Sequence, residues 1–179
     1  TVFTRKDPLC SAYVGEYTAQ AQDILQQKNF TSSLVITSHG DKCTLLSNSI
    51  PNHNFNDGTK SFVNKTSEVH ESFSIALSPQ QASQKTALSL SYDNGIFLNG
   101  VKLDLLAAAC YGIGGEPLGQ EKKGCMSEKP WRYDTMYTGN NFGTDSHNEH
   151  TQADGSYHYH GDPKALYDTS GKTASALIG

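Results

Sequence analysis

The sequence predicts a mainly β protein, an antiparallel and sandwich-like sheet structure with one N-terminal helix and long ordered loops. Short runs in which apolar and polar residues alternate indicate half-buried strands. Tight-turn sequences at Asp93-Asn94-Gly95 and Asn99-Gly100 indicate hairpins between such runs. A stretch rich in Gly, Asn, Asp and His over 138–156 indicates a long loop. At 179 residues, the chain is expected to form a single domain over 1–179.

The predicted helix covers Tyr13 to Gln27. Within it, Tyr17, Ala21 and Ile24 follow Tyr13 at intervals of three and four residues, with Gln and Glu between them. This spacing places apolar side chains on one face of a helix.

After the helix the apolar period changes to two, which is the period of a strand. Each predicted strand has an alternating apolar set that a sheet face would bury. These sets are Leu34 and Ile36; Cys43 and Leu45; Phe73, Ile75 and Leu77; Leu88, Leu90 and Tyr92; and Val101 and Leu103.

Four cysteines are widely spaced, without a Cys-x-x-Cys pair, so two disulfides are expected rather than a zinc ribbon or a redox motif. Sequence allows three pairings, and we favour Cys10–Cys43 with Cys110–Cys125 because each pair closes a local loop. Sequons at Asn29 and Asn64 predict N-glycosylation. Together these features predict an extracellular, secreted or cell-surface glycoprotein.

Charge and hydropathy exclude several classes of protein. The net charge is −4 and no basic patch interleaves with aromatic residues, so a nucleic-acid partner is not expected. No apolar run approaches the roughly 20 residues of a membrane span. The chain also lacks a P-loop, a Gly-x-Ser-x-Gly elbow and a His-Glu-x-x-His sequence.

Candidate metal ligands concentrate near the C-terminal end, where four of the seven histidines lie between 147 and 160. In a strand, His158 and His160 project from the same face, roughly 6.5–7 Å apart. Tyr157 and Tyr159 face the opposite way and are expected to pack in the core. Imidazole pairs on a rigid strand suit a transition-metal ion such as copper, zinc, nickel or iron, and we favour copper or zinc.

The preceding loop supplies further candidate ligands. His147 and His150 are three residues apart and fit one side of a helical turn capped by Asp145 or Ser146. Asp145 is itself a candidate metal ligand. An Asp154-Gly155 turn would fold this loop over the 157–160 strand.

A calcium ion at a second, oxygen-rich site is a further possibility. Its candidate ligands are Asn54, Asn56 and Asp57, or Asp145 and Asp154. Neither set matches an EF-hand, and ordinary turn formation is the alternative explanation.

The stretch from His150 to Gly161, with Pro163 after it, resembles the long His-x-Gln-x-Asp-Gly-x-Tyr-His-Tyr-His-Gly motif of the YHYH-domain family. Blocks at 49–53, 99–101 and 131–133, together with Asp145, are also similar to this family, so the resemblance covers roughly 47–163. It implies a secreted or surface protein that binds metal, and it adds His53 to the candidate ligands. It implies no reaction.

These observations leave three functional hypotheses. The first is a non-catalytic extracellular metal-binding glycoprotein. In an extension of this hypothesis it is a subunit of a surface or filamentous homopolymer, in which the apolar tail (Ala174, Ala176, Leu177 and Ile178) docks on a neighbour. The alternative is a secreted metalloenzyme, either a metal-dependent hydrolase with Glu149 as general base or a copper oxidoreductase. Carbohydrate binding through Trp131 is the third.

Overall fold

The computed structural model describes residues 7–59, 61–108, 110, 131–137 and 143–166. As predicted, this part of the chain is mainly β, with eight strands in two four-stranded sheets. The two helical segments in it, η1 (Cys10–Tyr13) and η2 (Lys164–Leu166), are short 3-10 turns. No helix in the described ranges has the length and apolar character needed to cross a membrane.

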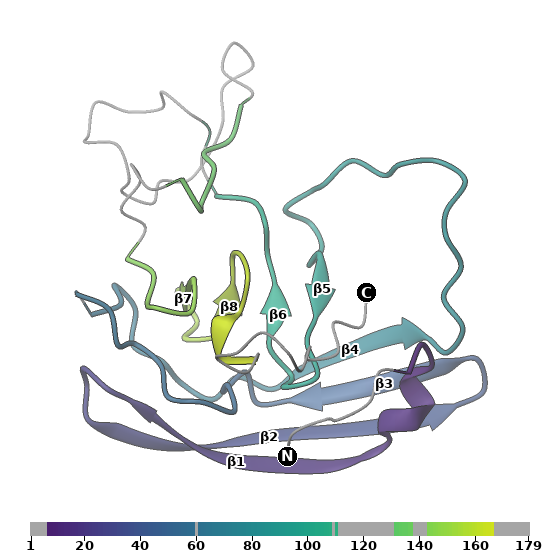
Figure 1. Ribbon diagram of the computed structural model, residues 1–179, viewed down its shortest axis with the longest axis horizontal. Coiled ribbons are helices and arrows are strands. Elements are labelled where there is room, and N and C mark those ends of the chain that lie inside the picture. The colour runs from purple at the N-terminus through teal and green to yellow at the C-terminus, as the bar shows by residue number, and fades with distance from the viewer. Residues whose placement is uncertain (1–6, 60, 109, 111–130, 138–142, 167–179) are drawn as a thin grey trace.

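The first sheet, sheet A, contains the longest strands and is antiparallel throughout. It has the order β1 (Gly15–Asp23), β2 (Lys28–His39), β3 (Lys42–Ser47) and β4 (Glu71–Ala76). Figure 1 shows these strands as a layer along the lower side of the molecule, with the shorter strands above it.

Alternating burial along sheet A follows the apolar period that the sequence shows. In β2, Phe30, Leu34 and Ile36 are buried, and in β3, Cys43 and Leu45 are buried. Because successive side chains of a strand point to opposite faces, one face of the sheet covers the core while the other meets solvent. The predicted strands around Leu34, Cys43 and Phe73 are therefore confirmed.

The predicted N-terminal helix is wrong, because most of Tyr13 to Gln27 forms β1 and the turn that leads to β2. Tyr17, Ala21 and Asp23 lie on the inward face of β1, a pattern of period two that the sequence contains alongside the helical one. All nine β1 residues pair with β2, whereas an isolated helix of about this length is only marginally stable in water.

The second sheet, sheet B, is small and has the order β5 (Gly95–Ile96), β6 (Lys102–Leu103), β8 (Tyr157–Tyr159) and β7 (Glu149–Thr151). Strands β6 and β8 are parallel, whereas the two outer pairs are antiparallel. The predicted turn at Asn99-Gly100 joins β5 to β6 and is confirmed, with Gly100 at φ +81°.

The predicted strand over Leu88–Tyr92 is absent, and this segment forms no sheet pairing among the described residues. Its apolar side chains Leu88, Leu90 and Tyr92 are each about half exposed. Alternation alone therefore does not form a strand here, because no neighbouring strand pairs with the backbone.

Two apolar clusters join the sheets. One cluster packs the tyrosines of β8 against residues of β1, β2 and the loops: Ala21, Phe30, Ile50, Phe55, Phe62, Phe97, Val101, Tyr157 and Tyr159. The other lies against η1 and contains Cys10, Tyr13, Leu34, Ile36, Cys43 and Leu45. The β7–β8 strand pair is thus anchored to the core by Tyr157 and Tyr159 of β8.

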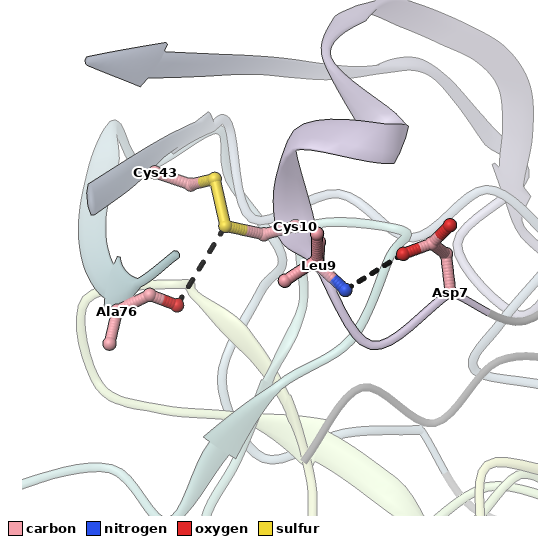
Figure 2. The surroundings of a disulfide bond; sticks show 5 residues. All are labelled: Asp7, Leu9, Cys10, Cys43 and Ala76. Atoms are coloured by element: carbon pink, nitrogen blue, oxygen red, sulfur yellow. Dashed lines mark hydrogen bonds between the residues drawn. A yellow bond between two sulfur atoms is a disulfide. The ribbon is translucent and has the colours of Figure 1, made fainter. Parts of the chain in front are cut away.

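A disulfide between Cys10 and Cys43 ties η1 to β3, as predicted (Figure 2). The carbonyl oxygen of Ala76 lies 3.8 Å from Cys10 Sγ. This is a polar contact, because a disulfide sulfur carries no proton to donate. Cys110 is also disulfide-bonded, and its expected partner Cys125 lies outside the described residues.

Candidate metal centres

The β7–β8 hairpin fixes the register of all the C-terminal candidate ligands. Its turn is closed by Gln152 N donating to Ser156 O (2.9 Å) and Gly155 N donating to Gln152 O (3.0 Å). This is the Asp154-Gly155 turn that the sequence predicts. His150 therefore stands opposite His158, and Glu149 stands opposite Tyr159.

Glycine is required at 155 for two reasons. Its φ of +88° lies in the left-handed region that side-chain-bearing residues rarely adopt. A Cβ atom there would lie 2.1 Å from Ser67 Oγ and 2.9 Å from Ser67 N. The backbone of the turn packs against the 65–67 segment, which positions the hairpin on the rest of the protein.

Strand alternation divides the candidate ligands between two faces of the β7–β8 pair. Residues paired across two strands point to the same side, so His150 and His158 share one face. Glu149 and Tyr159 share the opposite face. The helical turn expected to place His147 and His150 on one side is wrong. A turn runs from Asp145 to Asn148, and strand β7 begins at Glu149, so His150 lies in a strand.

On one face, His150, His158 and His160 form a compact group that we call the imidazole cluster. The Nε2 atom of His160 lies 3.0 Å from His158 Nε2 and 2.9 Å from His150 Nε2. All three side chains are buried, with 2–4% of their surface exposed. Three ring nitrogens therefore converge on one point with little access to water.

The tautomer of His160 is fixed by the backbone. Its Nδ1 lies 2.6 Å from the carbonyl oxygen of Asp104, which only accepts hydrogen bonds, so Nδ1 carries the proton. In the neutral ring, Nε2 then presents a lone pair to the other two histidines. A hydrogen bond on the far nitrogen is the usual way in which proteins orient a ligating histidine.

Burial favours the neutral form of His158 and of His160 in the imidazole cluster. Burial, together with the neighbouring His150, lowers the pKa of His160 to about 3. The pKa of His158 is also far below its usual value, first through burial and then through the positive charges that His160, His150 and Lys102 can carry. Neutral imidazole is the protonation state that binds metal ions.

The spacing of the imidazole cluster suits one ion. Two nitrogens bound to zinc at about 2.0–2.1 Å in tetrahedral geometry lie roughly 3.3 Å apart. The observed separations of 2.9 and 3.0 Å are within a few tenths of an ångström of that value. Small ring rotations would accommodate an ion among the three nitrogens, with Asp104 O still holding His160.

On the other face, His53, His147 and Glu149 form a second group, which we call the mixed cluster. His53 Nε2 lies 3.7 Å from Glu149 Oε1, and the two imidazole rings are 4.6 Å apart between centroids. His53 Nδ1 donates to Asn54 O (2.7 Å), while the Tyr159 hydroxyl lies 2.8 Å from His53 Nε2. Burial lowers the pKa of His53 to about 4.

Glu149 is fully buried, and neither of its carboxylate oxygens has a hydrogen-bond partner of normal geometry among the described residues. Burial raises the pKa of Glu149 well above its usual value, and the charge of Asp145 raises it further. The nearby Tyr157 hydroxyl acts in the opposite direction, but it donates its hydrogen bond to Asp145 Oδ2 (3.1 Å).

Asp145 is a hydrogen-bond acceptor that connects the segment at Asn56 with the segment at His147. It accepts from the backbone N–H of Asn56 (3.0 Å) and of His147 (2.9 Å), and from the Tyr157 hydroxyl. Burial raises its pKa. These bonds position His147, so the structure places Asp145 beside the clusters and its role as a ligand stays a prediction.

The residues considered for calcium accept hydrogen bonds from the protein itself. Asn54 accepts from Gln22 N, Asp57 from the N–H and hydroxyl of Ser146, and Asp154 from Ser156. These contacts are those of turns and loop anchors, and the calcium site stays a prediction.

None of the three cavities identified in the described part of the chain is lined by a residue of either cluster. The largest is a groove of about 560 Å³ between the edges of sheets A and B. Trp131, the candidate for carbohydrate binding, is 81% exposed, and that role stays a prediction.

The fold and these two clusters define a β-rich, disulfide-bonded protein with a concentrated set of buried histidines. A family model described as "YHYH protein" matches residues 72–179, more than half of the chain. The chain therefore belongs to the YHYH family. Comparisons with curated proteins and with solved structures gave no match.

Proposed function

We propose that this protein is an extracellular metal-binding protein whose imidazole cluster holds one transition-metal ion. The observation that carries the proposal is the convergence of three buried Nε2 atoms, 2.9 and 3.0 Å apart along the two measured edges. Without an ion, the Nε2 lone pair of His160 lies at hydrogen-bond distance from two imidazoles and can accept a proton from only one of them, which is unfavourable in a buried site. One ion would satisfy all three.

The donor set suits copper or zinc, since imidazole is a borderline ligand for both. His150, His158 and His160 would supply the nitrogens, and Asp104 O would orient His160. The near-complete burial of the cluster favours a closed site that stores or structurally uses its ion. This argues against the alternative of a metalloenzyme, which needs a coordination position open to substrate.

An extracellular location is supported by the Cys10–Cys43 disulfide and by the absence of a free cysteine among the described residues. Of the two sequons, Asn29 is exposed in β2, whereas the Asn64 amide donates to Thr151 O (3.1 Å) and its partner Thr66 is buried. We expect Asn29 to be the better acceptor of a glycan. We also propose that 1–179 is one domain.

Elemental analysis of the purified protein, beside a His158→Ala/His160→Ala variant, tests the metal. We expect about one equivalent of copper or zinc bound by the imidazole cluster and absent from the variant. His39→Ala is a matched control, because His39 is exposed at the far end of β2 and should leave the metal content unchanged. Equal metal in all three proteins would overturn the proposal.

Self-assembly is a second candidate function, supported by the groove between sheets. Strand β4 is the last strand of sheet A, and its residues line this groove together with β5 and the 93–94 segment. An extended segment of a second copy could add to such an edge. The apolar tail over 174–178 is our candidate segment, although it lies outside the described residues. Light scattering that shows a strict monomer at high concentration, with metal present, would contradict it.

A further inference from the structure

We propose that the mixed cluster of His53, His147 and Glu149 is a second metal site, separate from the imidazole cluster and composed of different donor atoms. It would hold a divalent transition-metal ion through two imidazoles and one carboxylate. The two sites would lie on opposite faces of the β7–β8 pair. This inference does not depend on whether the imidazole cluster binds metal.

Separation of the two sites follows from the strand geometry. Glu149 and His150 are neighbours in β7, so their side chains point to opposite faces of the sheet. Glu149 shares its face with Tyr159, whose hydroxyl lies 2.8 Å from His53 Nε2. A single ion therefore cannot use both clusters without crossing the strand backbone.

The ligand atoms of the mixed cluster lie within 4.8 Å of one another. Ligand atoms around one ion at about 2.0–2.2 Å lie roughly 3–3.4 Å apart. The 3.7 Å separation between His53 Nε2 and Glu149 Oε1 needs only a small adjustment to reach this value. Two imidazoles with one carboxylate form a recurrent set for zinc and for iron(II), which leaves further coordination positions open.

The strongest sign of a ligand is the carboxylate of Glu149. It is completely buried, and neither of its oxygens has a hydrogen-bond partner of normal geometry among the described residues. A buried carboxylate in this condition is costly unless a cation or donors compensate it. His147 Nδ1 is likewise buried without a partner. An ion would satisfy the carboxylate and an imidazole nitrogen together.

Neighbouring groups favour a cation at this position. Asp57 Oδ2 lies 3.8 Å from His147 Nε2, and Asp145 adds a second carboxylate nearby. The Asn54 carbonyl accepts the Nδ1 proton of His53, so the Nε2 lone pair of His53 points into the cluster. On binding, the ion would replace the Tyr159 hydroxyl at Nε2. That hydroxyl keeps a second partner, because Asn99 Nδ2 donates to it (2.8 Å).

The test counts metal ions and assigns each to a cluster. The protein is stripped with a chelator and titrated with Zn²⁺ by calorimetry, and with Co²⁺ as a spectroscopic probe of its ligands. We expect two equivalents for the unmodified protein and one each for His147→Asn, Glu149→Gln and His158→Ala/His160→Ala. The remaining Co²⁺ spectrum should differ between the His147→Asn and the double variant, because the surviving donor sets differ.

Glu149→Gln is the most informative variant, because it keeps the shape of the side chain and removes the charge. Circular dichroism and thermal unfolding in chelator establish that each variant folds. A Glu16→Gln variant, on an exposed position of β1, should bind two equivalents like the unmodified protein.

Each other outcome has a distinct meaning. One equivalent that is lost in the double variant but kept in His147→Asn and Glu149→Gln would overturn the second site and leave the imidazole cluster standing. One equivalent lost in His147→Asn and Glu149→Gln but kept in the double variant would overturn the imidazole site alone. Two equivalents retained by both mixed-cluster variants, or no binding at all, would also overturn the second site.

Discussion

Sheets A and B differ in the length of their strands and in the kind of side chain that they bury. Sheet A has strands of six to twelve residues, a regular alternation of buried apolar and exposed polar side chains, and a disulfide at one end. Sheet B has strands of two or three residues. Its buried positions include a lysine, a glutamate, a threonine and two histidines.

This difference separates stability from chemistry. Burying apolar surface in sheet A is favourable, whereas burying ionisable groups in sheet B is costly unless they are paired or bind an ion. Sites at which a sequence violates the rules for stable packing are commonly functional. We infer that sheet A and the aromatic cluster beneath β8 provide the free energy that holds the histidines and Glu149 in place.

Lys102 illustrates how the two sheets are connected. Its Nζ lies 2.6 Å from Glu71 Oε1 of β4, so a largely buried ion pair links β6 to sheet A. Burial lowers the pKa of Lys102, but the contact with Glu71 outweighs it and the pKa is raised. The lysine therefore stays charged near His158, which is one reason why that histidine stays neutral.

Truncation of the sheet A core should have the largest effect on stability. Leu45 is 2% exposed and packs in the cluster against η1. Leu45→Ala should lower the free energy of unfolding by about 2–5 kcal/mol through lost burial and a cavity. Urea denaturation measures the change, with Leu46→Ala as control, because Leu46 is 47% exposed on the same strand. Metal stoichiometry of the folded Leu45→Ala protein should not change. Equal destabilisation by both variants would contradict the assigned faces of β3.

Removal of the Cys10–Cys43 disulfide should follow in magnitude. The bond closes a loop with a sequence separation of 33 residues. Cys10→Ser/Cys43→Ser should therefore cost about 2–4 kcal/mol, largely by freeing the unfolded chain. The comparison of the two sheets predicts that metal binding survives at temperatures where the variant stays folded. Loss of metal without loss of secondary structure would show that the disulfide positions the site directly.

The sequence predicts β2, β3, the 99–100 turn and the burial of the β8 tyrosines because these residues satisfy local rules. Leu34, Ile36, Cys43 and Leu45 alternate in the strands that they form, and Asn99-Gly100 forms the turn that its residue types favour. Tyr157 and Tyr159 pack in the core on the face opposite His158, as the alternation predicts. Each of these features depends on the sequence within a few residues.

The errors concern features that depend on distant partners. The β1 residues also have a helical period, and only pairing with β2 selects the strand. The separation of the histidines into two clusters depends on recognising β7 as a strand. Given the Asp154-Gly155 turn, the register would have placed His150 opposite His158 and Glu149 opposite Tyr159. The Asp104 carbonyl and the hydroxyl of Tyr159 are contacts from remote segments, and no local pattern reveals them.

Substitution of Glu149 should reverse the usual sign of a core mutation. Glu149→Gln removes a carboxyl group whose ionisation burial opposes, without changing the side-chain volume, so in chelator at pH 7 it should raise the free energy of unfolding by about 1–3 kcal/mol. Thermal and urea unfolding measure the change. Glu16→Gln, exposed on β1, should be within about 0.5 kcal/mol of the unmodified protein. A destabilised Glu149→Gln apoprotein would mean that the carboxylate has a stabilising partner within the fold.

The most diagnostic effect is the dependence of metal-free stability on pH. The pKa is lowered to about 4 for His53, to about 3 for His160, and well below the usual value for His158, from 6.5 in each case. Below pH 6.5 the unfolded chain binds protons at these positions that the folded chain does not. Each histidine therefore lowers the free energy of unfolding by up to about 1.4 kcal/mol per pH unit as the pH falls toward its folded pKa.

Glu149 opposes this trend, because its raised pKa makes the folded chain bind the extra proton above pH 4.5. Its contribution to stability falls as the pH rises above 4.5, so over this range it acts against the histidines. Glu149→Gln should therefore show a steeper loss of stability than the unmodified protein as the pH falls through this range in chelator. Urea unfolding at a series of pH values measures both slopes. Parallel slopes would mean that the pKa of Glu149 is the same in the folded and the unfolded chain. Burial of this carboxyl group in sheet B would then carry no cost in stability.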